Sequence, residues 1–452
     1  RHIEEVLRPK LAACGPAEIA GVLTALDGRF VMPGPAGAPT RGRLDVLPTG
    51  RNSFSIDTRT VPTEAAYRLG SASAERLVKV YFQEHGRYPV QFAVSAWGTA
   101  NMRTGGDDIA QALALAGVRP TWDQASRRVS GYQIVPLSEL RRPRVDVLFR
   151  ISGFFRDAFP TQIDLVDSAF RAIAGLDEPD DANPLAAETR RVAAQLQRTG
   201  LDDAAAVRRA ASRVFGTRPG GYGAGVKDLV ETGKWTDRGD LARAYLAASS
   251  FAYGSGVDGD ERTDQFAGLV GRTDAVVQNQ DTREFDILDS TDFFEFEGGL
   301  ASAVAELAGR EPAIYHNDHS RPERPEVRRL GEEIARVVRA RAANPKWLTA
   351  ARSHGYKGGS EMVATVKNLV GFAATTTAVG DHQFDLLYDA YLVDPENLAF
   401  LANSNPAAID ELARRFIEAI DRQLWRPKRN SAYEHLKGLA IGIEKGGVRP
   451  LS

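Results

Sequence analysis

Over the first third of the chain, segments with the hydrophobic spacing of a helix alternate with segments that have the spacing of a strand. Apolar positions recurring every three to four residues predict helices over 65–84 and 109–116, with Asp107 as the N-cap of the second. Between them, the β-branched and aromatic run 90–97 predicts a strand, and similar runs predict strands over 133–135 and 144–151. Because strands that alternate with helices usually pair in parallel, we expect a parallel sheet whose functional loops follow the carboxyl ends of its strands.

Beyond residue 160 the pattern becomes mainly helical, whereas the residues before about 64 are broken by proline and glycine and show no clear period. Asn405 and Pro406 mark a helix start, as N-cap and first helical residue. The fold class expected is therefore α/β and multi-domain, with a parallel-sheet domain followed by a mainly helical C-terminal region. We expect four segments, an extended Pro/Gly-rich segment over 1–63, the sheet domain over 64–180, a helical domain over 181–275 and a mixed domain over 276–452. The later helices are expected at 162–174, 185–198, 201–214, 325–342, 360–373, 394–402 and 406–425.

Composition removes several classes of protein. The 452 residues carry 57 Lys and Arg against 59 Asp and Glu, so there is no basic excess of the kind that nucleic-acid binding requires. A single cysteine, Cys14, excludes an intramolecular disulfide or a cysteine-cluster metal site and fits a reducing cytoplasm. No run of 18 apolar residues occurs, so no membrane span is expected. The sequence begins at Arg1 rather than at methionine, and we expect it to be a piece of a longer chain.

Several catalytic motifs are absent. The glycine-rich stretch 216–225 resembles a phosphate-binding loop, but Val226 separates Gly225 from Lys227 and Asp228 stands where Ser or Thr is needed. We therefore expect no ATP binding by that route, and the stretch is either a mobile loop or one that contacts an anion. The sequence also lacks G-x-S-x-G and H-E-x-x-H, which disfavours common hydrolases and metalloproteases.

Two acidic segments are candidates for proton transfer or ligand binding. On a helix, Asp292 and Glu295 share a face through their i, i+3 spacing, beside phenylalanines that would raise a carboxyl pKa by burial. An acidic first helical turn would look the same. In the turn at 103–108, Asp107 is expected to cap a helix, which leaves Arg103 for a ligand carboxylate or amide.

Four of the seven histidines fall between residues 316 and 382. His316, Asp318 and His319 follow a short strand-like run and form a candidate transition-metal site, although isolated exposed histidines are commoner than ligands. Asp381 and His382 offer a base oriented by a carboxylate, or a metal ligand with its supporting group, against the alternative that Asp381 caps a helix.

Longer motifs resemble the large subunit of the tetrapyrrole metal chelatases, a family that comprises aerobic cobaltochelatase and its magnesium-chelatase counterpart. VQNQDTREFDILDS at 277–290, the HNDHSRPE segment at 316–323 and VGDHQFD at 379–385 favour the cobalt branch, because the magnesium type usually has Asn in place of His382. The sequence departs from the family at Glu295 and Glu297, where Gln and His are expected. The segments that carry the general resemblance are LPTGRN at 47–52, WGTANMRTGGDDIAQAL at 97–113, RPRVDVLFRISGFFRDAFP at 142–160, NPKW at 344–347, SHGYKG at 353–358 and the stretch 375–385.

The resemblance implies insertion of Co²⁺ into a corrin ring, hydrogenobyrinic acid a,c-diamide, in cobalamin synthesis. It implies that Co²⁺ is a substrate and that two partner subunits, one an AAA+ motor, hydrolyse the ATP. Family members are much longer, so this chain would be their C-terminal part. The alternatives are a magnesium-type porphyrin-binding subunit and a non-catalytic tetrapyrrole-binding scaffold.

The same resemblance supports a hypothesis for the site. Insertion needs bases for the pyrrolic protons, ligands for the metal and cations for the peripheral carboxylates of the ring. The expected catalytic residues are Asp292, Glu295, His354, Asp381 and His382. The expected metal ligands are Glu297, His316, Asp318, His319 and His382, and the expected substrate-binding residues are Arg51, Asn52, Arg103 and Arg156.

Overall fold

The chain forms two units, each described here by itself. The structure is a computed structural model that describes residues 1–35, 39, 44–51 and 56–444. The first unit comprises residues 1–222, 251–261 and 318–327, and the second comprises 223–250, 262–317 and 328–452. The polypeptide therefore passes from one unit to the other five times. The division into four consecutive segments stays a prediction.

Five strands of a mixed sheet form the core of the first unit. They are β1 (Gln91–Ala96), β4 (Asp146–Ile151), β5 (Val214–Gly216), β6 (Phe251–Gly254) and β7 (Val257–Glu261). Their order is β7-β6-β5-β4-β1, with β1, β4 and β5 parallel and with β6 and β7 added as an antiparallel hairpin. Every residue of β1 and β4 is buried, as is typical of parallel strands covered on both faces. The predicted parallel sheet is confirmed, and the hairpin at its edge was not predicted.

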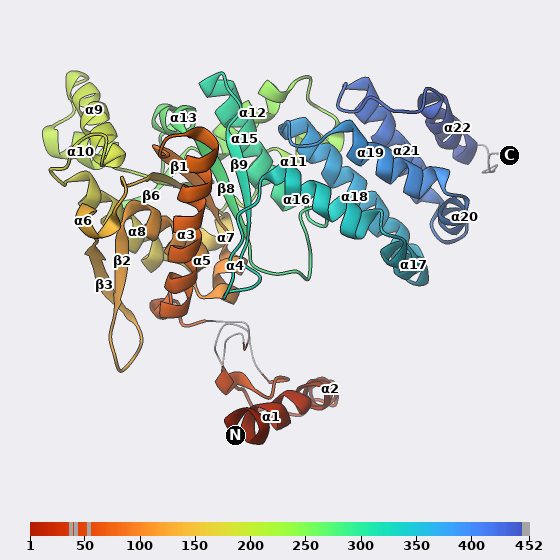
Figure 1. Ribbon diagram of the computed structural model, residues 1–452, viewed down its shortest axis with the longest axis horizontal. Coiled ribbons are helices and arrows are strands. Elements are labelled where there is room, and N and C mark those ends of the chain that lie inside the picture. Colours follow the sequence, from red (N-terminus) through yellow and green to blue (C-terminus); the bar gives the residue numbers. More distant parts are fainter. Residues whose placement is uncertain (36–38, 40–43, 52–55, 445–452) are drawn as a thin grey trace. The chain divides into compact units, whose positions relative to one another are not determined.

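Helices cover this sheet, and two of them pack unusually closely. A Cβ on Gly70 of α3 (Glu64–His85) would lie 2.6 Å from the Cβ of Ala110 on α5 (Asp107–Ala116), so glycine is required for the two helices to approach each other. Figure 1 shows α3 and α5 side by side.

A separate antiparallel hairpin consists of β2 (Val118–Trp122) and β3 (Val129–Ile134). The helices of the first unit are α1 (Arg8–Ala12), α2 (Cys14–Leu26), α3 (Glu64–His85), α4 (Gly98–Thr104), α5 (Asp107–Ala116), α6 (Leu137–Leu140), α7 (Gly153–Ala158), α8 (Pro160–Ala174), α9 (Pro184–Arg198) and α10 (Asp203–Ala210).

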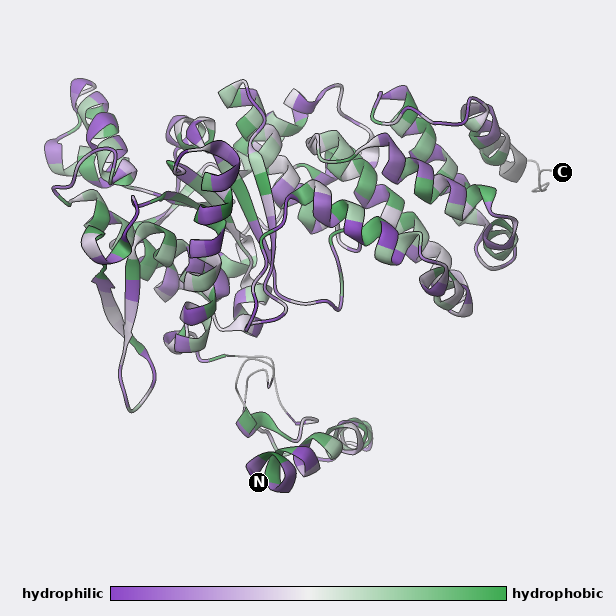
Figure 2. Cartoon of the chain, viewed as in Figure 1, coloured by the Kyte–Doolittle hydropathy of each residue, from purple (hydrophilic) through white to green (hydrophobic). Residues whose placement is uncertain are grey.

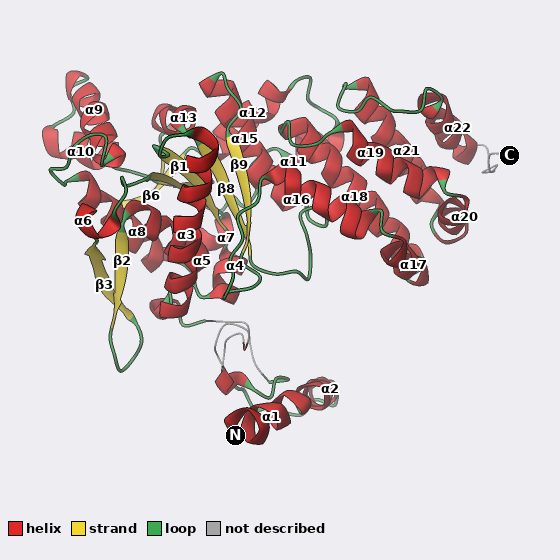
Figure 3. Cartoon of the chain, in the orientation of Figure 1, coloured by secondary structure: helices red, strands yellow, loops and turns green. Residues whose placement is uncertain are grey.

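The second unit contains two neighbouring buried strands, β8 (Ala275–Gln280) and β9 (Ala313–Asp318), and is otherwise helical. From residue 330 to residue 444 every described element is a helix, as Figure 3 shows, which confirms the predicted helical C-terminal region. Hydrophobic and hydrophilic residues alternate around these helices in Figure 2, the pattern of helices that bury one face. The helices are α11 (Lys227–Thr232), α12 (Arg238–Ser249), α13 (Thr263–Arg272), α14 (Thr291–Phe293), α15 (Gly299–Ala308), α16 (Leu330–Val337), α17 (Pro345–Ser353), α18 (Tyr356–Thr375), α19 (Asp381–Tyr388), α20 (Pro395–Ser404), α21 (Pro406–Asp421) and α22 (Ala432–Glu444).

Several local predictions need correction. Residues 3–26 are helical, not extended. The predicted strand at 133–135 belongs to the β2–β3 hairpin rather than to the parallel sheet, and the helix expected over 201–214 ends at Ala210 before β5. Asp107 is the first residue of α5 rather than its N-cap, which is Gly106. The Asp107 amide donates a hydrogen bond to the Thr104 hydroxyl (3.1 Å).

No helix among the described residues combines the length and the apolar character that crossing a membrane requires.

Candidate functional site

A buried histidine in the second unit lies between a carboxylate and an amide. Nδ1 of His316, on β9, is 3.0 Å from Oε2 of Glu297, and its Nε2 is 3.2 Å from Oε1 of Gln280, the last residue of β8. His316 and Glu297 are 1% and 0% exposed. We call Gln280, Glu297 and His316 the Glu/His cluster. Since both ring nitrogens face acceptor oxygens, the arrangement fits the protonated imidazolium, which has two donors.

The electrostatics of the Glu/His cluster favour a charged pair. Burial alone would lower the pKa of His316, but the carboxylates of Glu297 and Glu333 outweigh burial, and the pKa is raised. Burial raises the pKa of Glu297, against the opposing effect of His316. The other carboxylate oxygen of Glu297, Oε1, is buried and has no hydrogen-bond partner among the described residues. The pair therefore holds a carboxylate with a raised pKa and an unoccupied acceptor atom.

A wide helical turn positions Glu297. Residues 291–308 form one continuous helical segment in which Phe294–Gly298 adopts the π-helical form, a local irregularity frequent at functional sites. Small residues allow this turn to pack tightly. A Cβ on Gly298 would lie against the Thr375 hydroxyl, and one on Gly371 would lie 2.5 Å from the Phe294 ring. The ring of Phe293 meets that of His316 edge-on, with centroids 5.5 Å apart, and closes one side of the cluster.

Glu295, in the same π-helical turn, holds a glycine-rich loop. Its Oε1 accepts the backbone amide of Ala224 at 2.7 Å, and the side chain is buried. Gly223 leaves room for this contact, because a Cβ there would lie 3.2 Å from the same oxygen. Thus the loop segment does contact an anion, but the anion is a carboxylate of this chain. Asp292 is exposed while Glu295 is buried, so the expected shared face of these two residues is wrong.

Three other expected catalytic residues lie at helix ends of the second unit. His354 follows α17 and is exposed, with Nδ1 4.0 Å from Oε2 of Glu361. Asp381 and His382 begin α19, where Asp381 accepts the amide of Arg426 at 2.8 Å and His382 is exposed. The N-cap of α19 is Gly380, so Asp381 does not cap that helix but secures the segment after α21.

His319 and Asp318 belong to the first unit. Nε2 of His319 is 2.8 Å from the hydroxyl of Ser73, and its Nδ1 is 3.5 Å from Oδ2 of Asp107. Ser73 also accepts a hydrogen bond from Gln111. All of these residues except Asp318 are almost completely buried, which is the environment of a core histidine. Asp318 accepts from the amide and hydroxyl of Ser320, within its own turn.

The expected substrate-binding cations also lie in the first unit. The guanidinium of Arg156, on α7, donates to the carbonyls of Arg218 and Gly221 and pairs with Asp157, so it fastens the start of the glycine-rich loop. Arg103 is half-buried on α4, and Arg51 is exposed. Asn52 lies outside the described residues.

Only part of the hypothetical site is assembled. The structure brings Glu297 and His316 into contact. Glu295, Asp381, Asp318, His319 and Arg156 have the other partners given above. Within the described part of the chain, no group of three or more His, Cys, Asp or Glu side chains could hold a metal ion. The metal-ligand roles stay predictions. Sequence reasoning missed Gln280 and Glu333; the polar ending of the apolar strand run at 275–280 was the available signal for Gln280.

Comparisons with known proteins bear on the family and the fold of the chain. The family model described as CobN/magnesium chelatase matches residues 1–432. The aerobic cobaltochelatase subunit CobN of Sinorhizobium sp. is 56% identical over 98% of this chain and 35% of its own length, and that of Pseudomonas aeruginosa is 51% identical over 98% and 36%. The solved catalytic subunit of cobaltochelatase from Mycobacterium tuberculosis superposes with a TM-score of 0.91 at 44% identity, over 98% of this chain and 37% of that one. The chain spans about a third of the length of these relatives.

Proposed function

The chain belongs to the CobN/magnesium chelatase family, and from that membership we propose that it forms part of the large subunit of an ATP-dependent cobaltochelatase. In this proposal the protein inserts Co²⁺ into hydrogenobyrinic acid a,c-diamide in the cytoplasm during cobalamin synthesis. Two partner subunits, one an AAA+ motor, hydrolyse ATP. Cobalt is proposed over magnesium because the cobaltochelatase subunits CobN are 51–56% identical over nearly the whole chain.

One observation carries the chemical part of the proposal, namely the buried contact between Glu297 and His316. Metal insertion replaces the inner N–H proton of the corrin by the metal, because a metal-bound corrin carries a single negative charge, so the site needs a base that is ionised but only weakly acidic when protonated. Glu297 has these properties, because burial raises its pKa and Oε1 has no hydrogen-bond partner in the described structure. A proton taken up by Oε1 leaves Glu297 neutral beside His316, whose imidazolium then releases its own proton more readily.

The cobalt ion is a substrate in this reaction, so a resident metal site with a complete ligand set is not needed. Two protein ligands at a time suffice if the ring nitrogens supply the rest, and imidazole and carboxylate are both ligands that Co²⁺ accepts. We propose that Glu297 and His316 form one such pair once both have given up their protons, because only the carboxylate and the neutral imidazole have a lone pair for the metal. Asp292, Glu295, His354, Asp381, His382 and the first-unit residues Asp318 and His319 remain candidates for the path of metal or protons, and Arg51, Asn52, Arg103 and Arg156 for holding the ring.

Replacement of Glu297 tests the proposal. In the full-length subunit reconstituted with its two ATPase partners, Glu297→Gln is expected to lower the rate of Co²⁺ insertion by 10²-fold or more, the range for loss of a general base. Corrin absorbance measures insertion. The exposed carboxylate Glu323 provides the matched control, and Glu323→Gln is expected to leave the rate unchanged. A wild-type rate in a folded Glu297→Gln variant would contradict the role of the cluster.

A ligand titration tests the alternative, a magnesium-type or purely binding subunit. The family model covers both metal branches. Corrin and porphyrin are titrated separately into the full-length subunit and followed by absorbance. Tight binding of corrin alone supports the cobalt reaction, and tight binding of porphyrin alone contradicts it.

A further inference from the structure

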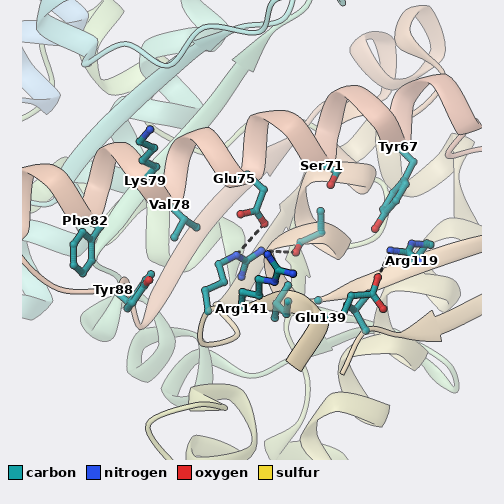
Figure 4. A pocket seen from close by; sticks show the side chains of 15 residues that line it. Tyr67, Ser71, Glu75, Val78, Lys79, Phe82, Tyr88, Arg119, Glu139 and Arg141 are labelled. Carbon is teal, nitrogen blue, oxygen red and sulfur yellow. Dashed lines mark hydrogen bonds and ion pairs between the residues drawn. The ribbon is translucent and has the colours of Figure 1, made fainter. Parts of the chain in front are cut away.

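A long groove follows helix α3 in the first unit, and none of the candidate site residues named above lines it. Its volume is about 570 Å³. Figure 4 shows α3 as one wall, with side chains of the β2 and α6 region facing it. The α3 wall presents Tyr67, Ser71, Glu75, Val78 and Phe82, spaced by four, four, three and four residues. At 1.5 Å per residue this stripe is about 22 Å long, the length of about four helical turns.

The floor and one end of the groove are apolar. Val78 is almost completely buried, and Leu140 and Val135 face the groove from the opposite wall. Phe82 and Tyr88 are each 42% exposed, and their ring centroids are 4.8 Å apart. Exposed, neighbouring aromatic rings at the end of an apolar groove are typical of binding surfaces.

The charges of the groove do not balance. Glu75 pairs with Arg142 at 3.0 Å, and Glu139 pairs with Arg119 at 2.7 Å. These pairs use both acidic side chains of the lining. Two exposed cations, Lys79 and Arg141, have no ion-pair partner among the described residues. The backbone of Arg141 is in the left-handed conformation (φ 56°), which is uncommon for residues other than glycine and asparagine.

We propose that this groove docks an acidic amphipathic helix of a partner protein. The apolar face of such a helix would lie along Val78, Phe82 and Tyr88, and its Asp or Glu residues would pair with Lys79 and Arg141. The length of the stripe leaves room for about four turns of a docked helix, and the two unpaired cations determine the charge of the occupant. This inference is independent of the chelatase chemistry proposed for the second unit.

A displayed library of random 16-residue peptides, selected on the full-length subunit, tests the proposal. Enriched peptides are expected to be acidic, with apolar residues at helical spacing. Fluorescence anisotropy then compares binding to the wild type with binding to the variant Lys79→Glu, Arg141→Asp, in which aspartate keeps a residue tolerant of positive φ. We expect affinity to fall at least tenfold, and a proline in the centre of the peptide to abolish binding. Arg198→Asp with Arg339→Glu reverses two exposed cations elsewhere and is expected to leave affinity unchanged.

Three outcomes would overturn the proposal. The first is no enrichment or enrichment of peptides without net negative charge. The second is equal affinity for the wild type and the charge-reversed variant. The third is a wild-type dimer in sedimentation experiments that the reversal abolishes, which would identify a second copy of this chain as the occupant.

Discussion

Glu333 provides a quantitative test of the electrostatics around the Glu/His cluster. This carboxylate, on α16, is 1% exposed and is contacted by Arg336 at 2.5 and 2.8 Å, by Arg283 at 3.2 Å and by Arg328 at 3.4 Å. Burial alone would raise its pKa, but the hydrogen bonds of Arg336 and the charges of His316, Arg336 and Arg283 lower the pKa to about 2 from an ordinary 4.5.

The lowered pKa translates into a free energy of unfolding. The difference between the ordinary pKa of 4.5 and the folded-state pKa of about 2 corresponds to about 3 kcal/mol, because a tenfold change in an equilibrium constant corresponds to about 1.4 kcal/mol. A depressed carboxyl pKa stabilises the folded state above the unfolded pKa, and that contribution disappears as the pH falls toward the folded pKa. Glu333→Gln mimics the protonated carboxyl. The free energy of unfolding of this variant is therefore expected to be lower than that of the wild type by about 3 kcal/mol at pH 7 and by about 2 kcal/mol at pH 3.5. We call this difference the deficit.

Urea unfolding followed by tryptophan fluorescence measures this deficit over the pH range. Three of the five tryptophans, Trp235, Trp347 and Trp425, lie in the second unit with Glu333. The exposed control Glu323→Gln should change the free energy of unfolding by less than about 0.5 kcal/mol at every pH. A deficit below about 1 kcal/mol at pH 7, or one that does not narrow on acidification, would refute the charge-based explanation.

Two further substitutions test packing. Gly371→Ala is expected to lower the free energy of unfolding by about 1–3 kcal/mol, because the added Cβ would press on Phe294. Gly268→Ala, in an exposed part of α13 with no atom within 4 Å, is expected to raise the free energy of unfolding by about 0.5–1 kcal/mol. Chemical denaturation measures both changes, and changes of the same sign would contradict the argument that Gly371 allows a close approach. Ser73→Ala removes the hydroxyl that contacts His319 and Gln111, and the buried groups left behind are expected to cost about 1–3 kcal/mol. Thermal unfolding detects that loss, and an unchanged transition would show that water or a neighbour replaces the hydroxyl.

Helical periodicity predicted much of the fold because the pattern is local. The helix expected over 65–84 spans Glu64–His85, and the start at Asn405 and Pro406 is confirmed, with the Asn405 side chain accepting the Ala408 amide. Short strands such as β6 and β7 were missed, since four or five residues carry too little periodicity to identify them. The helix over residues 14–26 was missed because Gly15 and Pro16 interrupt its start and it buries no side chain.

The candidate site was less predictable because it depends on long-range contacts. The residue types were recognised, yet Glu297 and His316 are 19 positions apart and meet only when the π-helical turn packs beside β9. The i, i+3 argument for Asp292 and Glu295 assumed 3.6 residues per turn, and the wider turn invalidates that assumption. Likewise, nothing local distinguishes the buried His319 from the exposed His382.

The interleaving of the two units limits how this protein can evolve. Because the chain passes between them five times, no single recombination breakpoint separates one complete unit from the other. Neither unit can then be lost, duplicated or exchanged as a cassette, unlike domains that follow one another along a chain. A continuous segment that contains the whole second unit therefore also carries residues 251–261 and 318–327 of the first.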